Sequence, residues 1–115
     1  MVKTNEQMTI ETRENMRGGD GTVTLKALFK AGEYDSKLRL FSRITLPAGA
    51  SIGYHIHDGE EEFYYFLEGS AEYNDNGEIK TVKAGDATIT KSGQGHSVKN
   101  TGDRPLELIA VIALV

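Results

Sequence analysis

Residues 49–69 decide the fold, and they read GASIGYHIHDGEEEFYYFLEG. Two β-rich runs, 51–57 and 62–67, lie on either side of an Asp-Gly pair that is typical of turns. Side chains two residues apart in a strand share a face, so His55 and His57 would project together from the first run. The stretch therefore predicts two neighbouring strands that place a pair of histidines on one face.

The rest of the chain repeats this alternation of β-rich runs and turn residues. The further runs cover residues 22–29, 37–46, 70–73, 78–82, 86–90, 96–100 and 105–114. No segment shows a long helical period, and Asn76-Gly77 is the clearest tight hairpin between two runs. Short strands at regular intervals predict an all-β domain, an antiparallel sandwich or barrel.

Length and composition predict one globular domain. The chain has 115 residues, of which 38% are hydrophobic and 26% are charged. We expect residues 1–21 to form an N-terminal arm and residues 22–115 to form the single folded domain. The net charge of -4 and the lack of a Lys/Arg cluster argue against a nucleic-acid partner.

The chain has no cysteine, which excludes disulfides, thiolate metal ligands and thiol nucleophiles. Any metal must therefore be held by nitrogen and oxygen atoms. The N-terminus lacks the apolar segment of a secretion signal, and the most apolar run, residues 106–115, is about half as long as a membrane-spanning helix. We expect a cytoplasmic protein with no membrane partner.

Glu62 follows the histidine pair across the turn and begins the next run. If that run returns beside the first, its carboxylate joins His55 and His57 in a three-sided group of metal ligands. Two histidines near an acidic run also occur on ordinary polar surfaces. The spacing of these three residues leaves both interpretations open.

The wider spacing resembles the two sequence motifs of the cupin family. The first motif is Gly49, five residues, His55-Ile56-His57, four residues, Glu62, six residues and Gly69. The second motif is Gly85, five residues, Lys91-Ser92-Gly93, two residues, His96, three residues and Asn100. Lys91 stands where the family pattern usually has proline, and this departure affects a local turn but no ligand position.

This resemblance implies a cupin jelly roll, a double-stranded β-helix barrel of two antiparallel sheets, over residues 22–115. Carried over position by position, the family's metal ligands fall on His55, His57, Glu62 and His96. Three imidazoles and one carboxylate suit Mn, Fe, Ni, Cu or Zn. We favour octahedral Mn(II) or Fe(II), which would keep two positions open for water or a small-molecule ligand, whereas tetrahedral Zn(II) would be closed.

The strand alternation also outlines a space beside the ion. Ser51 and Gly53 share the ligand face and are small, so we expect a gap there. Tyr64 and Phe66 would form its wall, and Tyr64, which can donate a hydrogen bond or a proton, is the candidate catalytic residue. The alternative is that both aromatic side chains are ordinary core.

Five other polar side chains lie in or near the two motifs. Arg39 and Arg43 are candidate anchors for a carboxylate, but the apolar residues that alternate with them favour the inner face of their strand. We expect Glu60 and Glu61 to form a solvated acidic rim, and Gln94 to be a polar contact near the barrel mouth.

The resemblance leaves two functions open. Residues 40–62 are most similar to small prokaryotic cupins described as oxalate-decarboxylase-like, but the true decarboxylases have an arginine where this chain has Ile52. The first hypothesis is a metal-dependent enzyme, an oxygenase, decarboxylase or lyase, acting on a small carboxylate or carbonyl substrate. The second hypothesis is a non-catalytic protein that binds or senses a small ligand anchored by its metal.

The run 62–67 is apolar on both of its faces. Tyr64 and Phe66 share the face of Glu62, and Phe63 and Tyr65 occupy the opposite one. A strand of this kind is typically covered on both sides, by the barrel interior and by another layer such as an N-terminal strand or a second subunit. We therefore expect a homodimer.

Overall fold

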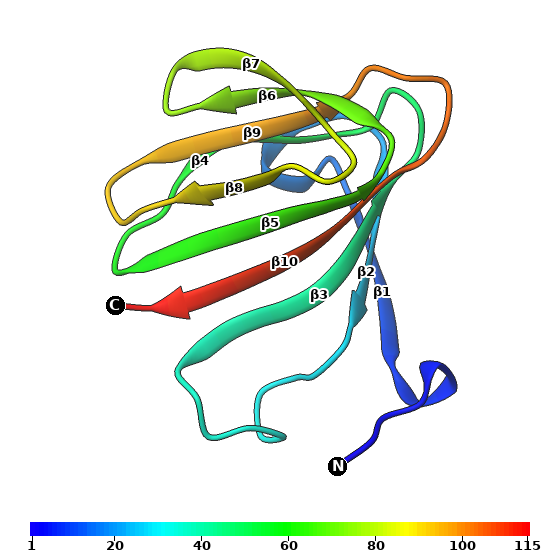
Figure 1. Ribbon diagram of the computed structural model, residues 1–115, viewed down its shortest axis with the longest axis vertical. Coiled ribbons are helices and arrows are strands. Elements are labelled where there is room, and N and C mark those ends of the chain that lie inside the picture. The colour runs from blue at the N-terminus through cyan, green and yellow to red at the C-terminus, as the bar shows by residue number, and fades with distance from the viewer.

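The computed structural model of the protein describes all 115 residues, and most of them lie in β-strands (Figure 1). The ten strands are β1 (Thr9–Glu14), β2 (Thr22–Ala27), β3 (Leu38–Leu46), β4 (Ser51–Ile56), β5 (Glu60–Glu68), β6 (Ser70–Asp75), β7 (Glu78–Lys83), β8 (Ala87–Thr90), β9 (Gly95–Asn100) and β10 (Leu106–Leu114). Two short 3₁₀ helices, η1 (Asn5–Gln7) and η2 (Met16–Gly18), flank β1. The structure has no helix of the length and apolarity that spanning a membrane requires.

The strands form two antiparallel sheets that face each other (Figure 1). One sheet has six strands in the order β1-β2-β3-β10-β5-β8, and the other has four in the order β4-β9-β6-β7. Each sheet combines strands from distant parts of the sequence, so the chain passes repeatedly from one layer to the other, as in a jelly roll. The predicted all-β class and two-sheet barrel are confirmed.

The strands β2 to β10 begin and end within two residues of the predicted runs. The tight hairpin between β6 and β7 is also present, because Asn76 and Gly77 both have positive φ (50° and 99°). Positive φ at both central residues is the requirement of a two-residue type I′ turn, and Asn-Gly meets it at little cost. Local turn chemistry therefore fixes this end of the four-stranded sheet.

The core lies between the two sheets because their strands alternate buried and exposed side chains. Ile44, Phe66 and Leu108 face the interior from three neighbouring strands of the larger sheet. Tyr73 and Val98 face them from the smaller sheet. Each such buried apolar side chain contributes about 1.5–3 kcal/mol to stability. The polar residues of the first motif enter this otherwise apolar interior.

The N-terminal arm contributes a strand that was not among the predicted runs. β1 pairs with β2 along its whole length, although all six of its residues are exposed. It is the edge strand of the larger sheet, and its sequence TIETRE has no apolar face that would have identified it. Backbone pairing holds β1 and sets the path of the arm towards β4.

After β1 the arm turns through η2 and lies tightly against β4. Asp20 and Ser51 exchange two hydrogen bonds: the Asp20 N–H donates to Ser51 Oγ (2.8 Å), and the Ser51 N–H donates to the Asp20 carbonyl (2.9 Å). A Cβ added to Gly53 would lie 2.1 Å from the carbonyl oxygen of Arg17. The arm therefore fills the space beside Ser51 and Gly53, where a gap was predicted, and that prediction was wrong.

A bulge in β4 explains the error. The pairing of β4 with β9 slips between Ile52 and His55, where β4 carries one extra residue. An extra residue shifts the alternation by one position. Ile52 consequently faces the core, with 1% of its surface exposed, on the same side as His55. Ser51 and Gly53 face the arm instead of the ion.

Candidate metal centre

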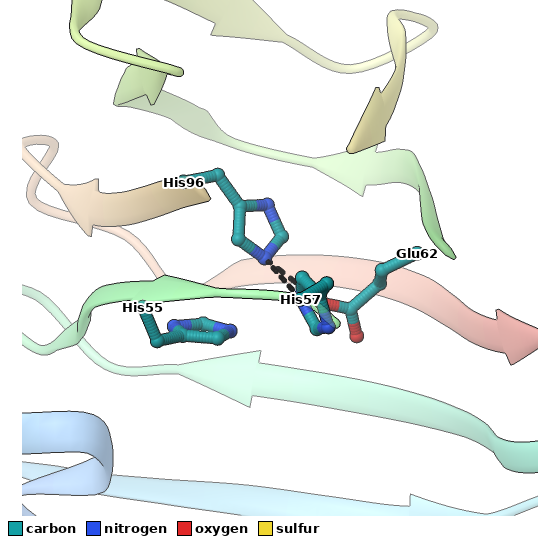
Figure 2. Close-up of side chains that lie close together, drawn as sticks. All are labelled: His55, His57, Glu62 and His96. Carbon is teal, nitrogen blue, oxygen red and sulfur yellow. Dashed lines mark hydrogen bonds and ion pairs between the residues drawn. The ribbon is translucent and has the colours of Figure 1, made fainter. Parts of the chain in front are cut away.

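The four predicted metal ligands converge between the two sheets (Figure 2). His55 lies in β4, and His57 is the first residue after that strand. Glu62 lies in β5 and His96 lies in β9. Their donor atoms, one from each residue, all lie within 4.8 Å of one another. His57, Glu62 and His96 are buried. Residues from opposite sheets thus form one polar group in an apolar interior.

Three of these donor atoms are spaced as ligands of a single ion would be. The Nε2 atom of His57 lies 3.1 Å from both Glu62 Oε1 and His96 Nε2. Glu62 Oε1 lies 2.9 Å from His96 Nε2. These separations are short enough for the three atoms to bind the same ion.

Each histidine is also held through its second ring nitrogen. His55 Nδ1 lies 2.7 Å from the carbonyl oxygen of Gly53, and His96 Nδ1 lies 2.7 Å from the hydroxyl of Tyr73. A partner on Nδ1 fixes the orientation of the ring and directs Nε2 towards the cluster. The Tyr73 hydroxyl also contacts Thr90 Oγ1 at 3.1 Å, so it can either donate to or accept from His96.

Glu60 holds the third histidine, contrary to the prediction that it lies on a solvated rim. Its Oε2 accepts hydrogen bonds from His57 Nδ1 (3.0 Å) and from the guanidinium of Arg39 (2.7 Å). Burial opposes ionisation of Glu60, but the hydrogen bonds from Arg39 and His57 outweigh it and lower its pKa below 4.5. Glu60 therefore stays charged and connects Arg39 to the cluster.

The same balance keeps Glu62 ionised. Burial would raise its pKa, but hydrogen bonds from His57 and His96 outweigh burial and lower the pKa to about 2. These bonds use the ring atoms that would bind a metal, so protons and a metal ion compete for the same positions. The carboxylate is available as a ligand at any physiological pH.

We predict that the affinity for a divalent metal falls as the pH falls below neutral. The hydrogen bond to Glu62 outweighs burial and, helped by Glu60, raises the pKa of His57 above 6.5 in the metal-free protein. Below that pKa a proton occupies the nitrogen that the metal needs, and above it none competes. Mn²⁺ titrations by calorimetry between about pH 6 and pH 8 should show proton release and about tenfold weaker binding per pH unit below this pKa. A constant affinity would contradict the prediction.

Replacing Glu60 by alanine is expected to weaken metal binding about 10- to 100-fold, because His57 loses the partner that orients its ring. Glu61→Ala is the matched control, since Glu61 is adjacent to Glu60 and its side chain makes no hydrogen bond or ion pair with the four ligands. Competition titrations with a chromogenic chelator would measure both affinities. Equal affinities of the two variants would show that Glu60 does not position His57.

A cavity of about 480 Å³ opens beside the cluster. Its wall is formed by His55, His57, Glu62, Tyr64 and Arg39, by the apolar side chains Leu25, Leu40, Ile44, Ile52 and Ile112, and by residues 12–17 of the arm. The arm thus closes one side of the cavity, and apolar strands of the larger sheet form much of the rest. A small molecule in this cavity would reach the four candidate metal ligands.

Tyr64, the candidate catalytic residue, is buried on this wall. Its ring lies 5.1 Å from the ring of His96, measured between centroids. Burial raises the pKa of Tyr64 well above 10.0, and the negative charge of Glu62 adds to this effect. The hydroxyl therefore stays protonated at neutral pH and can donate a hydrogen bond. Phe66 packs edge-on against Tyr64 in the core and does not line the cavity.

The remaining candidate residues lie away from the cavity. Arg43 pairs with Glu107 at 3.0 Å on the outer side of its strand. Gln94 does not line the cavity, because its Oε1 accepts a hydrogen bond from the N–H of Lys91 (3.0 Å). A proline at position 91 has no N–H to donate, so lysine gives this turn a hydrogen bond that the usual family residue cannot make.

Comparison with known proteins agrees with this architecture. The chain is 45% identical, over its full length and 95% of the relative, to the oxalate-binding protein of Thermotoga maritima. The crystal structure of a predicted oxalate decarboxylase from Thermotoga maritima matches with a TM-score of 0.95 and 45% identity, over all of both chains. The polyketide cyclase RemF from Streptomyces resistomycificus shares the fold, with a TM-score of 0.76 and 20% identity over 99% of this chain and 80% of that one.

The family assignment rests on both sequence and structure. Residues 42–112, which run from β3 to β10 and include all four candidate ligands, match the Cupin domain family. The two facing sheets and the positions of both motifs agree with that match. The chain belongs to the cupin domain family.

Proposed function

We propose that this protein binds a divalent metal ion through His55, His57, Glu62 and His96, and uses the ion to hold a small carboxylate such as oxalate. The observation that carries the proposal is the convergence of four donor atoms, three of them 2.9–3.1 Å apart, beside a cavity. Four protein ligands on an octahedral ion leave two positions, and a small carboxylate can bind there.

The choice of ligand is supported by a relative and by the chemistry of the site. The full-length relative from Thermotoga maritima is named an oxalate-binding protein. Mn(II) and Fe(II) prefer octahedral coordination, which leaves two positions beyond the four protein ligands, and both bind carboxylate oxygens well. Ni(II) and Zn(II) are the alternatives that metal analysis would distinguish.

Different residues would have different roles in binding the metal and the carboxylate. Glu62 supplies the negative charge, while Glu60 and Tyr73 orient the imidazoles of His57 and His96. Tyr64 remains protonated and can donate a hydrogen bond to a ligand oxygen. The apolar side chains of the cavity wall exclude water and strengthen these polar interactions. The bound ion would supply Lewis acidity.

The experiment that tests the proposal compares metal-free and metal-loaded protein. Protein stripped with a chelator is reloaded with Mn²⁺ and titrated calorimetrically with oxalate, and acetate serves as the monocarboxylate control. We expect oxalate to bind only to the loaded protein. Equal binding to the stripped protein, or none to the loaded protein, would overturn the proposal. Elemental analysis of protein from its native host identifies the physiological ion.

Catalysis on the bound carboxylate is the second candidate function. It is favoured by the protonated hydroxyl of Tyr64 on the cavity wall, which can deliver a proton to a reacting ligand. Incubation of loaded protein with small carboxylates and carbonyl compounds, under air and under nitrogen, tests it. Turnover that needs oxygen indicates an oxygenase, and turnover without oxygen indicates a decarboxylase or lyase. Oxalate that is bound and recovered unchanged supports the binding function.

We also propose that the protein is a homodimer. Phe63 and Ile89 lie opposite each other on the outer face of β5 and β8, and each is 40% exposed. Tyr65, on the same face of β5, is 50% exposed. A contiguous exposed apolar patch is typical of a protein–protein interface. Light scattering coupled to gel filtration should give twice the chain mass of 12.6 kDa, and Phe63→Lys should reduce it towards the monomer.

A further inference from the structure

Three arginines line the cavity, and two of them already have carboxylate partners. Arg13 pairs with Glu11 at 2.9 Å, and Arg39 pairs with Glu60 at 2.7 Å. Arg17 makes no ion pair and its side chain makes no hydrogen bond within the protein. The carboxylates of the cavity wall, Glu14 and Glu62, lie more than 4.0 Å from it. Arg17 is therefore the cation of this wall that is free to bind an added anion.

The backbone at Arg17 is held in one conformation. Arg17 adopts φ 54° and ψ 30°, a left-handed conformation that costs a residue with a side chain about 1–2 kcal/mol. Its carbonyl oxygen occupies the place where Gly53 lacks a Cβ, and Gly19 approaches the backbone of Ser51 equally closely. Asn15 Nδ2 donates to the Gly19 carbonyl at 3.0 Å and closes the turn. Tight packing of η2 on β4 thus fixes where the Arg17 side chain begins.

Arg17 lies on the same cavity wall as His55 and Tyr64. Its carbonyl oxygen packs against Gly53, two residues before His55. A ligand bound in this cavity beside His55 and Tyr64 is therefore within reach of the Arg17 guanidinium.

We infer that Arg17 determines ligand specificity: its guanidinium binds the carboxylate oxygens of a short dicarboxylate that are not used by the metal. This inference rests on the proposed function and extends it to a ligand class, a dianion of the size of oxalate. A guanidinium has paired donors that match a carboxylate, and it gains most from a ligand with a second negative charge.

The test compares Arg17→Gln with Arg43→Gln, which removes the same charge from an arginine that pairs with Glu107 outside the cavity. Both variants and the parent are loaded with Mn²⁺, analysed for metal, and titrated with oxalate and acetate by calorimetry. We expect Arg17→Gln to weaken oxalate binding at least about tenfold, with acetate binding and metal content unchanged. Arg43→Gln should stay within about twofold of the parent, and Arg17→Lys should recover part of the loss.

The outcomes separate this inference from the proposed function. If the loaded parent binds oxalate and Arg17→Gln binds it equally well, the role of Arg17 is overturned and the proposed function stands. If the loaded parent binds no carboxylate, the proposed function is overturned and the role of Arg17 with it. Equal losses for oxalate and acetate in Arg17→Gln would overturn the selection of a dianion. If both glutamine variants lose oxalate affinity equally, the loss is a general effect of the removed charge, and the specific role of Arg17 is overturned.

Discussion

Protein in which His57 is replaced by alanine is expected to purify with at most about a tenth of the metal bound by the parent. His57 provides one of the four converging donor atoms, and its ring is held on both sides by Glu60 and Glu62. Alanine removes that ligand and leaves three of the four donor atoms. The metal-to-protein ratio from elemental analysis measures the effect.

Two controls keep this result interpretable. His57→Gln retains a polar side chain of similar volume at a position that is 2% exposed, so it separates loss of a ligand from loss of packing. Circular dichroism of each variant establishes whether the β-barrel is intact. An unchanged metal-to-protein ratio in a folded His57→Ala variant would show that the metal site has been assigned wrongly.

The fold could be predicted because its signals are local. Turn residues such as Asn76-Gly77 mark the strand ends, and period-two alternation marks the inner and outer faces of β5. The motif spacing then brought His96, which is distant in sequence, to the other two histidines. The local signals did not predict β1, because it is an exposed edge strand held by backbone pairing, and such a strand needs no alternation of apolar residues.

The interior of the site was less predictable because it depends on register and on distant segments. The bulge in β4 moves Ile52 to the cavity wall and turns Gly53 towards the arm. A glycine inside a strand signals a bulge or a close backbone approach, but it does not say which residues change face. Arg17 reaches the cavity only because β1 pairs with β2 and carries η2 back to β4. Because β1 was not predicted, the contribution of residues 12–17 to the cavity wall could not be predicted either.

The partners of the ligands were missed for a similar reason. Glu60 lies next to Glu61 in sequence, and nothing in the sequence distinguishes a partly buried carboxylate bound to Arg39 from a solvated one. Tyr73 is placed beside His96 by the pairing of β6 with β9. A usable signal was the position of Glu60, three residues after His57 across a short turn, since a carboxylate at that distance can reach Nδ1.

Replacing Asn100, the last residue of the second motif, by alanine is expected to lower the free energy of unfolding by about 2–5 kcal/mol. Asn100 is 1% exposed, and its Nδ2 donates to the carbonyls of Leu46 (2.9 Å) and Arg104 (2.8 Å). Its Oδ1 accepts from the Gly102 N–H at 3.0 Å. Alanine removes the side-chain partner of these three backbone groups and opens a small cavity.

Denaturant unfolding of chelator-treated protein measures the loss, because bound metal would stabilise the folded state and mask it. Lys99→Ala is the matched control, since Lys99 is adjacent and exposed on the other face of β9. A fall in Tm of about 10 °C should accompany the change. Asn100→Asp keeps the volume and the acceptor but removes the Nδ2 donor, so an equally large loss would assign the effect to hydrogen bonding. Stability equal to that of Lys99→Ala would contradict the prediction.

Asn100 lies at the opposite end of β9 from His96, so the folded variant should retain its metal. The second motif would then combine one metal ligand with one purely structural residue.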